Sequence, residues 1–208
     1  MINDRHQLIK AALKRARGGS GSNLNALHEA HAGYSTAGLV PDLGSVSYVI
    51  VGGLATACYM PRRMTLDTDI LVSLEDLPPA ESALTAANCT RTGTLASVSS
   101  TWRMPGGRAL DVIALDNHWV HDAIHSAHVG ENGLPYIALP YLVLMKLESG
   151  RLQDLADISR MMGFADNPAV DRTRSLVNTH RPNDLEDLEG MIRLGKLEHE
   201  QGNSTTSG

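Results

Sequence analysis

The chain has 208 residues, of which 42 % are hydrophobic and 20 % are charged. This balance is typical of a folded globular protein and argues against a disordered or fibrous one. No apolar run approaches the roughly 20 residues that a membrane-spanning helix needs. The N-terminus is polar and basic, without the apolar core of a secretory signal, and two cysteines do not make a disulfide framework. We therefore expect a cytoplasmic protein with no membrane partner.

Charge is distributed unevenly along the chain. The net charge is −5 overall, but residues 1–115 carry +1 and residues 116–208 carry −6. A basic cluster falls in the first predicted helix, over residues 4–17, where it could contact RNA phosphates or form a solvated helix face. Both interpretations stay open for these side chains, which are Lys10, Lys14, Arg15 and Arg17.

The first part of the chain predicts alternating helices and strands. Apolar spacing, β-branched runs and turn residues distinguish the two kinds of element. Two prolines, Pro78 and Pro79, begin one helix, and a Pro-Gly-Gly turn at residues 105–107 joins the last two strands. After the helix at 4–17, the expected elements are a weak helix over 24–32, a strand over 46–51, a helix over 53–60 and a strand over 68–74. A helix that starts at Pro78 and ends at about residue 87 follows, and then strands over 94–103 and 109–115.

From Pro140 onward, the apolar spacing is helical throughout. The last residues are Gly, Asn, Ser and Thr, which predicts a disordered tail. The fold class is therefore α/β or α+β, with a mixed sheet flanked by helices and followed by a C-terminal helical region. The expected boundaries are 1–135 for the α/β part, 136–200 for the helical region and 201–208 for the tail. The expected helices of the second part start at Pro140 and then cover about 151–162, 168–178 and 183–198.

Two aspartates stand at the start of an apolar strand. Asp67 and Asp69 are two residues apart, so their side chains face the same side of the strand. Asp111 begins a second apolar strand, and a neighbouring position would bring it beside them. Such carboxylates suit Mg²⁺ or Mn²⁺, and three of them can hold two ions for phosphoryl or nucleotidyl transfer. The alternative is an exposed strand edge with solvated acids, and Asp116, at the other end of the second strand, is a competing third ligand.

A glycine pair follows the buried strand that ends near Val51. Gly52 and Gly53 would allow the backbone to approach a ligand closely, and the start of the next helix would offer free N–H groups to phosphate. A Gly-Gly pair by itself favours an ordinary turn.

The combination of these features resembles a known family. Gly-Gly, thirteen residues, Asp-x-Asp and a later Asp on a strand are similar to the nucleotidyltransferase superfamily with the DNA polymerase β-like fold. The segment from Arg63 to Asp69 looks like the Arg-x-Ser/Thr-x-Asp-x-Asp element of small bacterial members. The resemblance implies a nucleotidyltransferase core, an NTP substrate and magnesium. It also implies that Arg63 neutralises triphosphate charge and that Thr65 adds a hydroxyl contact.

The helical part adds a second resemblance. Lys146 in an apolar helix, followed by an Arg-x-x-Asp-x-x-Asp segment, is similar to the AbiEii-like group, which contains toxins of toxin–antitoxin and phage-defence systems. The resemblance implies that Lys146 contacts the triphosphate or helps activate the acceptor. The alternative is that Lys146 pairs with a local acid. The segment's site residues would be Arg151, Asp154 and Asp157.

Four histidines are spaced by three, four and three residues, so on one continuous helix they would share a face. A zinc site is one interpretation, and a polar surface helix that contacts RNA is the favoured one. These residues are His118, His121, His125 and His128.

Together these features predict a metal-dependent nucleotidyltransferase that moves a nucleoside monophosphate from an NTP to an acceptor hydroxyl. Its acceptor would be tRNA or a protein, and its role would be that of a toxin with an antitoxin partner. Two alternatives are an antibiotic-type adenylyltransferase and a non-catalytic module that binds another protein.

Overall fold

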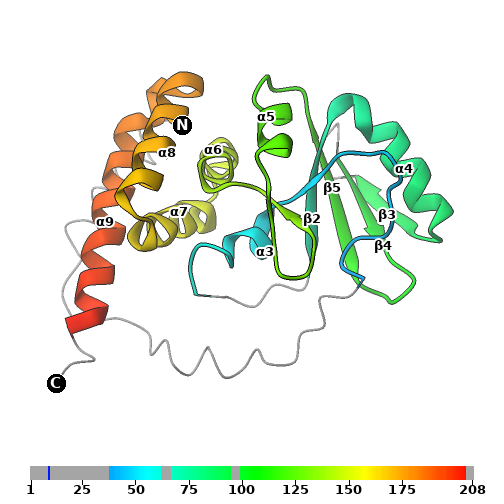
Figure 1. The fold of residues 1–208 in the computed structure, drawn as a ribbon, viewed down its shortest axis with the longest axis horizontal. Helices are drawn as coiled ribbons and strands as arrows, with labels where there is room; N and C mark the ends of the chain where they lie inside the picture. The colour runs from blue at the N-terminus through cyan, green and yellow to red at the C-terminus, as the bar shows by residue number, and fades with distance from the viewer. Residues whose placement is uncertain (1–8, 10–37, 62–66, 95–98, 205–208) are drawn as a thin grey trace. The chain divides into compact units, whose positions relative to one another are not determined.

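The structure is a computed structural model that describes residue 9 and residues 38–61, 67–94 and 99–204. These residues fall into two compact units (Figure 1). A sheet unit ends at Ala138, and a helical unit begins at Leu139 and also includes Tyr59–Pro61. The helices expected over 4–17 and 24–32, the basic cluster of Lys10, Lys14, Arg15 and Arg17, and the site residues Arg63 and Thr65 lie outside the described residues.

Seven strands of the described chain form one mixed sheet with the order β3-β4-β5-β2-β1-β7-β6. The pairs β2–β5 and β1–β7 are parallel, and the other neighbours are antiparallel. The strands are β1 (Val49–Ile50), β2 (Thr68–Ser73), β3 (Thr90–Thr94), β4 (Ser99–Arg103), β5 (Ala109–Leu115), β6 (His128–Val129) and β7 (Pro135–Tyr136).

Alternating residues of the two central strands build the core of the sheet unit. Ile70 and Val72 of β2 and Val112 of β5 are fully buried on one face. Helix α4 (Leu77–Ala86) buries Ala80 and Leu84 completely. Prolines in its first turn favour the start of this helix. The opposite face is therefore the one on which polar β2 and β5 side chains are placed.

Shorter helical segments complete the sheet unit: α3 (Gly52–Thr56), the 3-10 turn η1 (Leu74–Asp76) and α5 (Val120–His125). The predicted strands around β2, β4 and β5, the helix α4 and the turn at residues 105–107 are confirmed. Strand β1 and helix α3 are shorter than expected. The expectation missed β3, β6 and β7, because β3 is polar and exposed along its whole length and the other two are only two residues long.

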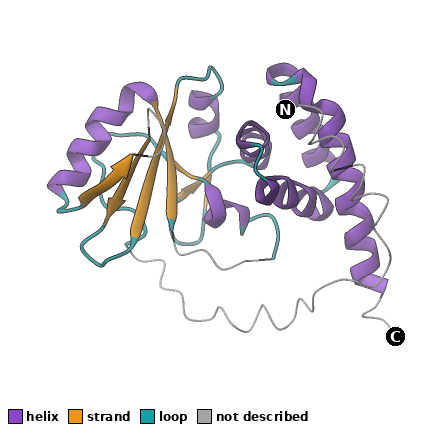
Figure 2. Ribbon diagram, turned by 180° about the vertical axis from the view of Figure 1, so that it is seen from behind, coloured by secondary structure: helices purple, strands orange, loops and turns teal. Residues whose placement is uncertain are grey.

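The helical unit contains α6 (Leu139–Ser149), α7 (Leu152–Phe164), α8 (Asn167–His180), the 3-10 turn η2 (Pro182–Asp184) and α9 (Leu185–Ser204). Helices α7 and α9 pack with their backbones in contact (Figure 2). A Cβ on Gly195 would lie 1.9 Å from the carbonyl oxygen of Ser159, so only glycine permits this approach.

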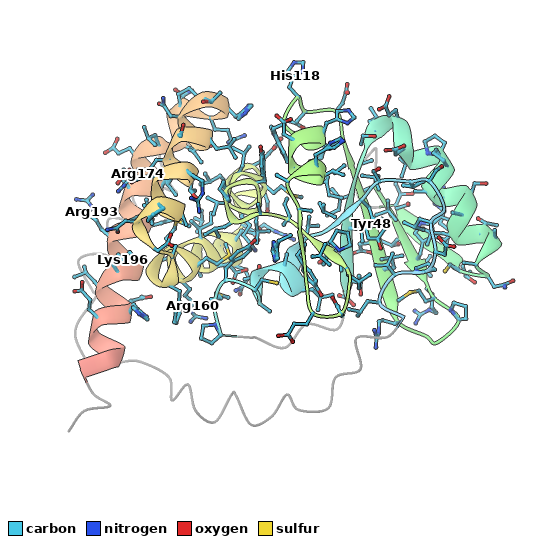
Figure 3. The ribbon with its side chains drawn as sticks, viewed as in Figure 1. Tyr48, His118, Arg160, Arg174, Arg193 and Lys196 are labelled. Atoms are coloured by element: carbon cyan, nitrogen blue, oxygen red, sulfur yellow. The ribbon has the colours of Figure 1, made fainter. Side chains whose placement is uncertain are left out.

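Polar contacts add to this helix packing (Figure 3). Arg174 of α8 donates two hydrogen bonds to Glu189 of α9, at 2.5 and 3.0 Å. Lys196 of α9 donates to the carbonyl oxygen of Ala165 at the end of α7, where the helix dipole favours a cation.

The predicted fold class, a mixed sheet with flanking helices followed by a helical region, is confirmed. One detail is wrong: α9 continues to Ser204, whereas the polar composition predicted a disordered tail from residue 201. A helix that has already formed adds each further residue at low cost, so a glycine near its end does not stop it. None of the described helices is long and apolar enough to span a membrane.

Candidate functional site

The sheet unit brings the predicted aspartates together. Strand β2 pairs with β5 in parallel, and the register places Asp69 directly opposite Asp111. Residues that face each other across neighbouring strands carry their side chains on the same face. Asp67 immediately precedes β2 and, two residues from Asp69, belongs to that face. Asp116 follows the far end of β5 and is exposed, so the register favours Asp111 as the third acid.

Asp111 has an unusual environment for a carboxylate. Burial, and then the charges of Asp69 and Asp67, raise the pKa of Asp111 to about 6. Within the described part of the chain, its carboxylate accepts no hydrogen bond and forms no ion pair. A half-buried acid that repels its neighbours and lacks a compensating partner is destabilising unless a cation or a proton joins it.

Gly52 lies against the Asp69 carboxylate. Its φ of +59° is in the left-handed region, and an added Cβ would lie 1.9 Å from Asp69 Oδ2. The N–H of Val51 donates to the Asp69 carbonyl oxygen at 2.9 Å, which fixes this end of β1 to β2. Gly52 is therefore needed both for its conformation and for its lack of a side chain.

Helix α3 is shorter than predicted. It begins at Gly52 and ends at Thr56, where the helix was expected to continue to residue 60. The Thr56 hydroxyl donates a hydrogen bond to the Gly52 carbonyl oxygen at 2.8 Å. Gly52 is therefore fixed by this bond and by the one that the preceding residue, Val51, donates to Asp69. Phosphate binding at Gly52 and Gly53 stays a prediction.

The face of the sheet that carries Asp67, Asp69 and Asp111 is called the acidic face. Strand β4 adds to it polar side chains that the sequence did not reveal. The antiparallel register places Thr101 opposite Asp111 and Arg103 opposite Ala109. Thr92 of β3 donates a hydrogen bond from its hydroxyl to the Thr101 hydroxyl at 3.1 Å. The alternation of β4, with buried Ser100 and Trp102 between more exposed polar residues, is the signal that could have revealed these positions.

The acidic face supplies the oxygen ligands that Mg²⁺ prefers, but it is not a complete metal cage. The described residues contain no group of three or more His, Cys, Asp or Glu side chains arranged to hold a metal ion. Mg²⁺ is commonly held by one or two carboxylates together with substrate phosphates. Asp111, which has no hydrogen-bond or ion-pair partner among the described residues, thus fits an ion that binds together with a triphosphate.

A second charged cluster lies in the helical unit, around Lys146. The Lys146 Nζ is 2.9 Å from Asp154 Oδ1 and 2.7 Å from Asp157 Oδ2. Only 7 % of the Lys146 side chain is exposed, and Asp157 is fully buried. The structure therefore has the pairing with local acids that the sequence left open as an alternative, and the role of Lys146 toward a triphosphate stays a prediction.

Additional hydrogen bonds satisfy the acids of this cluster. Asp154 accepts from the Ser149 hydroxyl at 2.5 Å and from Arg151 Nε at 2.8 Å, and Gln153 donates to Asp157 at 3.1 Å. Burial raises the pKa of Asp154, but the hydrogen bonds from Ser149, Arg151 and Lys146 outweigh it and hold that pKa below its usual value. The cluster joins α6 to the first turn of α7.

The four histidines do not gather into one site. Helix α5 ends at His125, so His118 precedes it and His128 stands on β6, where its ring stacks on Tyr136. His121 lies 3.7 Å from Glu75, and no metal-binding group forms among the described residues. The expectation of one shared helix face is wrong, because the helix stops before it reaches His128.

The fold and the site together define a mixed-sheet protein with a carboxylate cluster on adjacent parallel strands. No family model matches the chain, and no curated protein is similar to it in sequence. Among solved structures, it is similar to the crystal structure of ANT(2″)-Ia in complex with adenylyl-2″-tobramycin, with 11 % identity, 82 % of this chain and 92 % of that chain covered, and a TM-score of 0.41. It is also similar to the solution structure of the antibiotic-resistance factor ANT(2″)-Ia, with 13 % identity, 98 % and 100 % covered, and a TM-score of 0.40.

Proposed function

We propose that this chain is a nucleotidyltransferase that moves a nucleoside monophosphate from an NTP to an acceptor hydroxyl and releases pyrophosphate. The observation that carries the proposal is the pairing of Asp69 with Asp111 on neighbouring parallel strands. Like charges in such a position cost stability, and none of the described residues gives Asp111 a hydrogen bond or ion pair that would offset that cost. A structural role would favour a neutral or paired residue at this position.

The proposed site assigns a role to each residue on the acidic face. Asp67, Asp69 and Asp111 would hold Mg²⁺ or Mn²⁺, which, when bound, neutralises charge on the phosphates and favours ionisation of the acceptor hydroxyl. By resemblance, Asp111 would bind the ion that activates the acceptor hydroxyl. Gly52 leaves room for the Asp69 carboxylate.

In the transfer step, the acceptor oxygen forms a bond to the α-phosphorus of the NTP as the bond to the leaving pyrophosphate breaks. The proton of the acceptor hydroxyl passes to a base on the acidic face. Contacts of the triphosphate with Gly52, Gly53, Arg63, Thr65 and Lys146, and a contribution from Arg151, Asp154 and Asp157, belong to this proposal by resemblance.

A transfer assay with matched variants tests the proposal. Each labelled NTP is incubated with the chain, Mg²⁺ or Mn²⁺, and in turn total RNA, total protein and an aminoglycoside, and labelled products are separated. We expect label on one acceptor class, loss of that label in Asp111→Asn, and near-normal label in Asp116→Asn, because Asp116 is exposed at the far end of β5. Equal activity of the two variants, or no transfer from any NTP, would contradict the proposed function.

Two biological settings suit such an enzyme. A toxin would modify tRNA or a protein and would be neutralised by an antitoxin, so expression with and without its neighbouring gene tests that role. An antibiotic-type adenylyltransferase would instead modify a hydroxyl of a cationic drug. The assay distinguishes the two by the class of molecule that carries the label.

A further inference from the structure

The strand order divides the acidic face into two parts, one on each side of Asp111. Along the sheet, β1 and β2 lie on one side of Asp111, and β4 and β3 lie on the other. One row across the strands runs from Thr101 through Asp111 to Asp69, and Gly52 lies against that end. If the triphosphate lies against Gly52, the acceptor has to approach Asp111 from the β4 side.

Arg103 is a cation on that β4 side. It is exposed, two residues from Thr101, and is opposite Ala109 in the register. Its Nη1 donates to the carbonyl oxygen of Gly107 at 3.2 Å, and within the described part of the chain its guanidinium forms no ion pair. The turn thus fixes the side chain through a neutral group and leaves its charge available to a ligand.

Arg103 does not neutralise the nearby acids. Thr68 pairs with Leu110, so Asp67, one residue earlier, lies in the same row as Ala109 and Arg103. Asp67 is two strands away from Arg103 in that row. Neighbouring strands lie about 4.8 Å apart, so the two backbone positions are separated by roughly 10 Å, and no ion pair joins the two side chains among the described residues. The small side chain of Ala109 lies between them.

A β-bulge places a hydroxyl beside the same row. The register between β3 and β4 shifts between Arg91 and Gly93, so Thr92 is an extra residue opposite Thr101. Bulges commonly redirect a side chain near a functional site. Here the Thr92 hydroxyl reaches Thr101, and a Cβ at Gly93 would lie 2.9 Å from the Thr101 hydroxyl oxygen. A polar pair therefore borders Asp111 on the acceptor side.

We infer that Thr101 and Arg103 form the acceptor side of the site and select a nucleic-acid acceptor, whose phosphate binds Arg103 while its terminal hydroxyl lies near Thr101 and Asp111. This inference rests on the proposed function, because it takes the transfer site to be the one around Asp69 and Asp111. Arginine suits phosphate because its planar guanidinium donates paired hydrogen bonds. The same cation repels a polycationic drug.

Binding of a short 5′-labelled single-stranded RNA tests the inference without turnover. Fluorescence anisotropy is measured with Mg²⁺ and a non-hydrolysable ATP analogue, at several salt concentrations. We expect Arg103→Ala to weaken binding about tenfold, the scale of one charge-assisted hydrogen bond, and to lower the salt slope by about 0.7. Arg91→Ala is the matched control, because Arg91 lies on β3, the strand next to β4, but pairs with Glu81 of α4.

Two further readouts separate the possible outcomes. Affinity for the ATP analogue should not change in Arg103→Ala, and Thr101→Val should raise the KM for the RNA more than it lowers kcat. No RNA binding by the unaltered chain, equal effects of Arg103→Ala and Arg91→Ala, or a loss of nucleotide affinity in Arg103→Ala would overturn the inference. RNA binding that depends on Arg103 in a chain without transferase activity would instead contradict the proposed function and leave the RNA-binding surface in place.

Discussion

The two units treat their aspartates in opposite ways. In the helical unit, Asp154 and Asp157 are buried beside Lys146, and hydrogen bonds hold the pKa of Asp154 below its usual value. In the sheet unit, Asp111 is less buried, yet burial and neighbouring acids raise its pKa to about 6. The acids of the helical unit are paired with a cation, whereas the acids of the sheet unit are grouped with one another.

This difference separates residues that stabilise the fold from residues that are available to a ligand. A buried acid with an ammonium and several donors around it is satisfied by the protein itself. An acid that faces other acids without a partner stores unfavourable energy, which a bound cation or proton removes. The contrast also bears on Lys146, whose two ion pairs stabilise the helical unit, while its contact with a triphosphate stays a prediction.

The largest expected effect concerns the cluster of Lys146, Asp154 and Asp157 in the helical unit. Replacing Lys146 with Met removes the buried ammonium from Asp157 and leaves Asp154 with Arg151 as its cation, so the free energy of unfolding should fall by about 3–5 kcal/mol. Arg151→Ala is the control, because 78 % of that side chain is exposed although it contacts the same Asp154, and exposed pairs contribute up to about 1 kcal/mol. Urea unfolding followed by circular dichroism measures both, and equal losses would show that the burial of Lys146 has no special weight.

The next effect is on catalysis at the acidic face, which carries Asp67, Asp69 and Asp111. Asp69→Asn keeps the shape of the side chain but removes a charge beside Asp111, so transfer should fall at least about a hundredfold, the scale seen when one electrostatic stabiliser is lost. The fold should persist, since repulsion between the acids is relieved. Initial rates with the acceptor found in the labelling assay, together with a melting curve, check both parts. Near-normal transfer by Asp69→Asn would move the site elsewhere.

A smaller effect concerns ligand-linked stability. If the acidic face binds metal and NTP together, ligand at ten times its Kd should stabilise the folded chain by about 1.4 kcal/mol. Thermal melting with Mg²⁺ alone, NTP alone and both components measures this. We expect the largest rise in Tm with both, because the described carboxylates do not form a complete cage by themselves. The same rise in Asp69→Asn would place the bound nucleotide away from this face.

The comparison also explains what the sequence could predict. The Asp-x-Asp spacing and the apolar runs of β2 and β5 were sufficient to predict three acids on one face, because side-chain alternation in strands follows directly from geometry. Thr101 and Arg103 were not found, because their importance depends on which strand pairs with β5, and β3 carries no apolar pattern. The pairing of Lys146 was left open, since an ion pair across α6 and α7 depends on how the two helices pack.

The smallest effect is a pH dependence that distinguishes the two clusters. Asp111 has a folded-state pKa of about 6 against a reference of 3.8, so the folded chain binds its proton more tightly than the unfolded chain does. As pH rises through this interval the unfolded state loses the proton first, and the free energy of unfolding falls by about 1 kcal/mol after allowance for solvent screening. Asp154 behaves in the opposite way: its lowered pKa contributes stability that is present above the reference value and is lost as pH falls below it.

Asp111→Asn should therefore be more stable than the unaltered chain at neutral pH, and the gap should close as pH falls below the reference value of 3.8, where both states become protonated. Urea unfolding in metal-free buffer over this range isolates the effect, because all other titrating groups are common to the two chains. Asp116→Asn, in the exposed position at the far end of β5, should show no such closing gap. A difference between the unaltered chain and Asp111→Asn that stays constant with pH would mean that Asp111 keeps an ordinary pKa. The acids of the sheet unit would then be too far apart, or too well solvated, to share a cation.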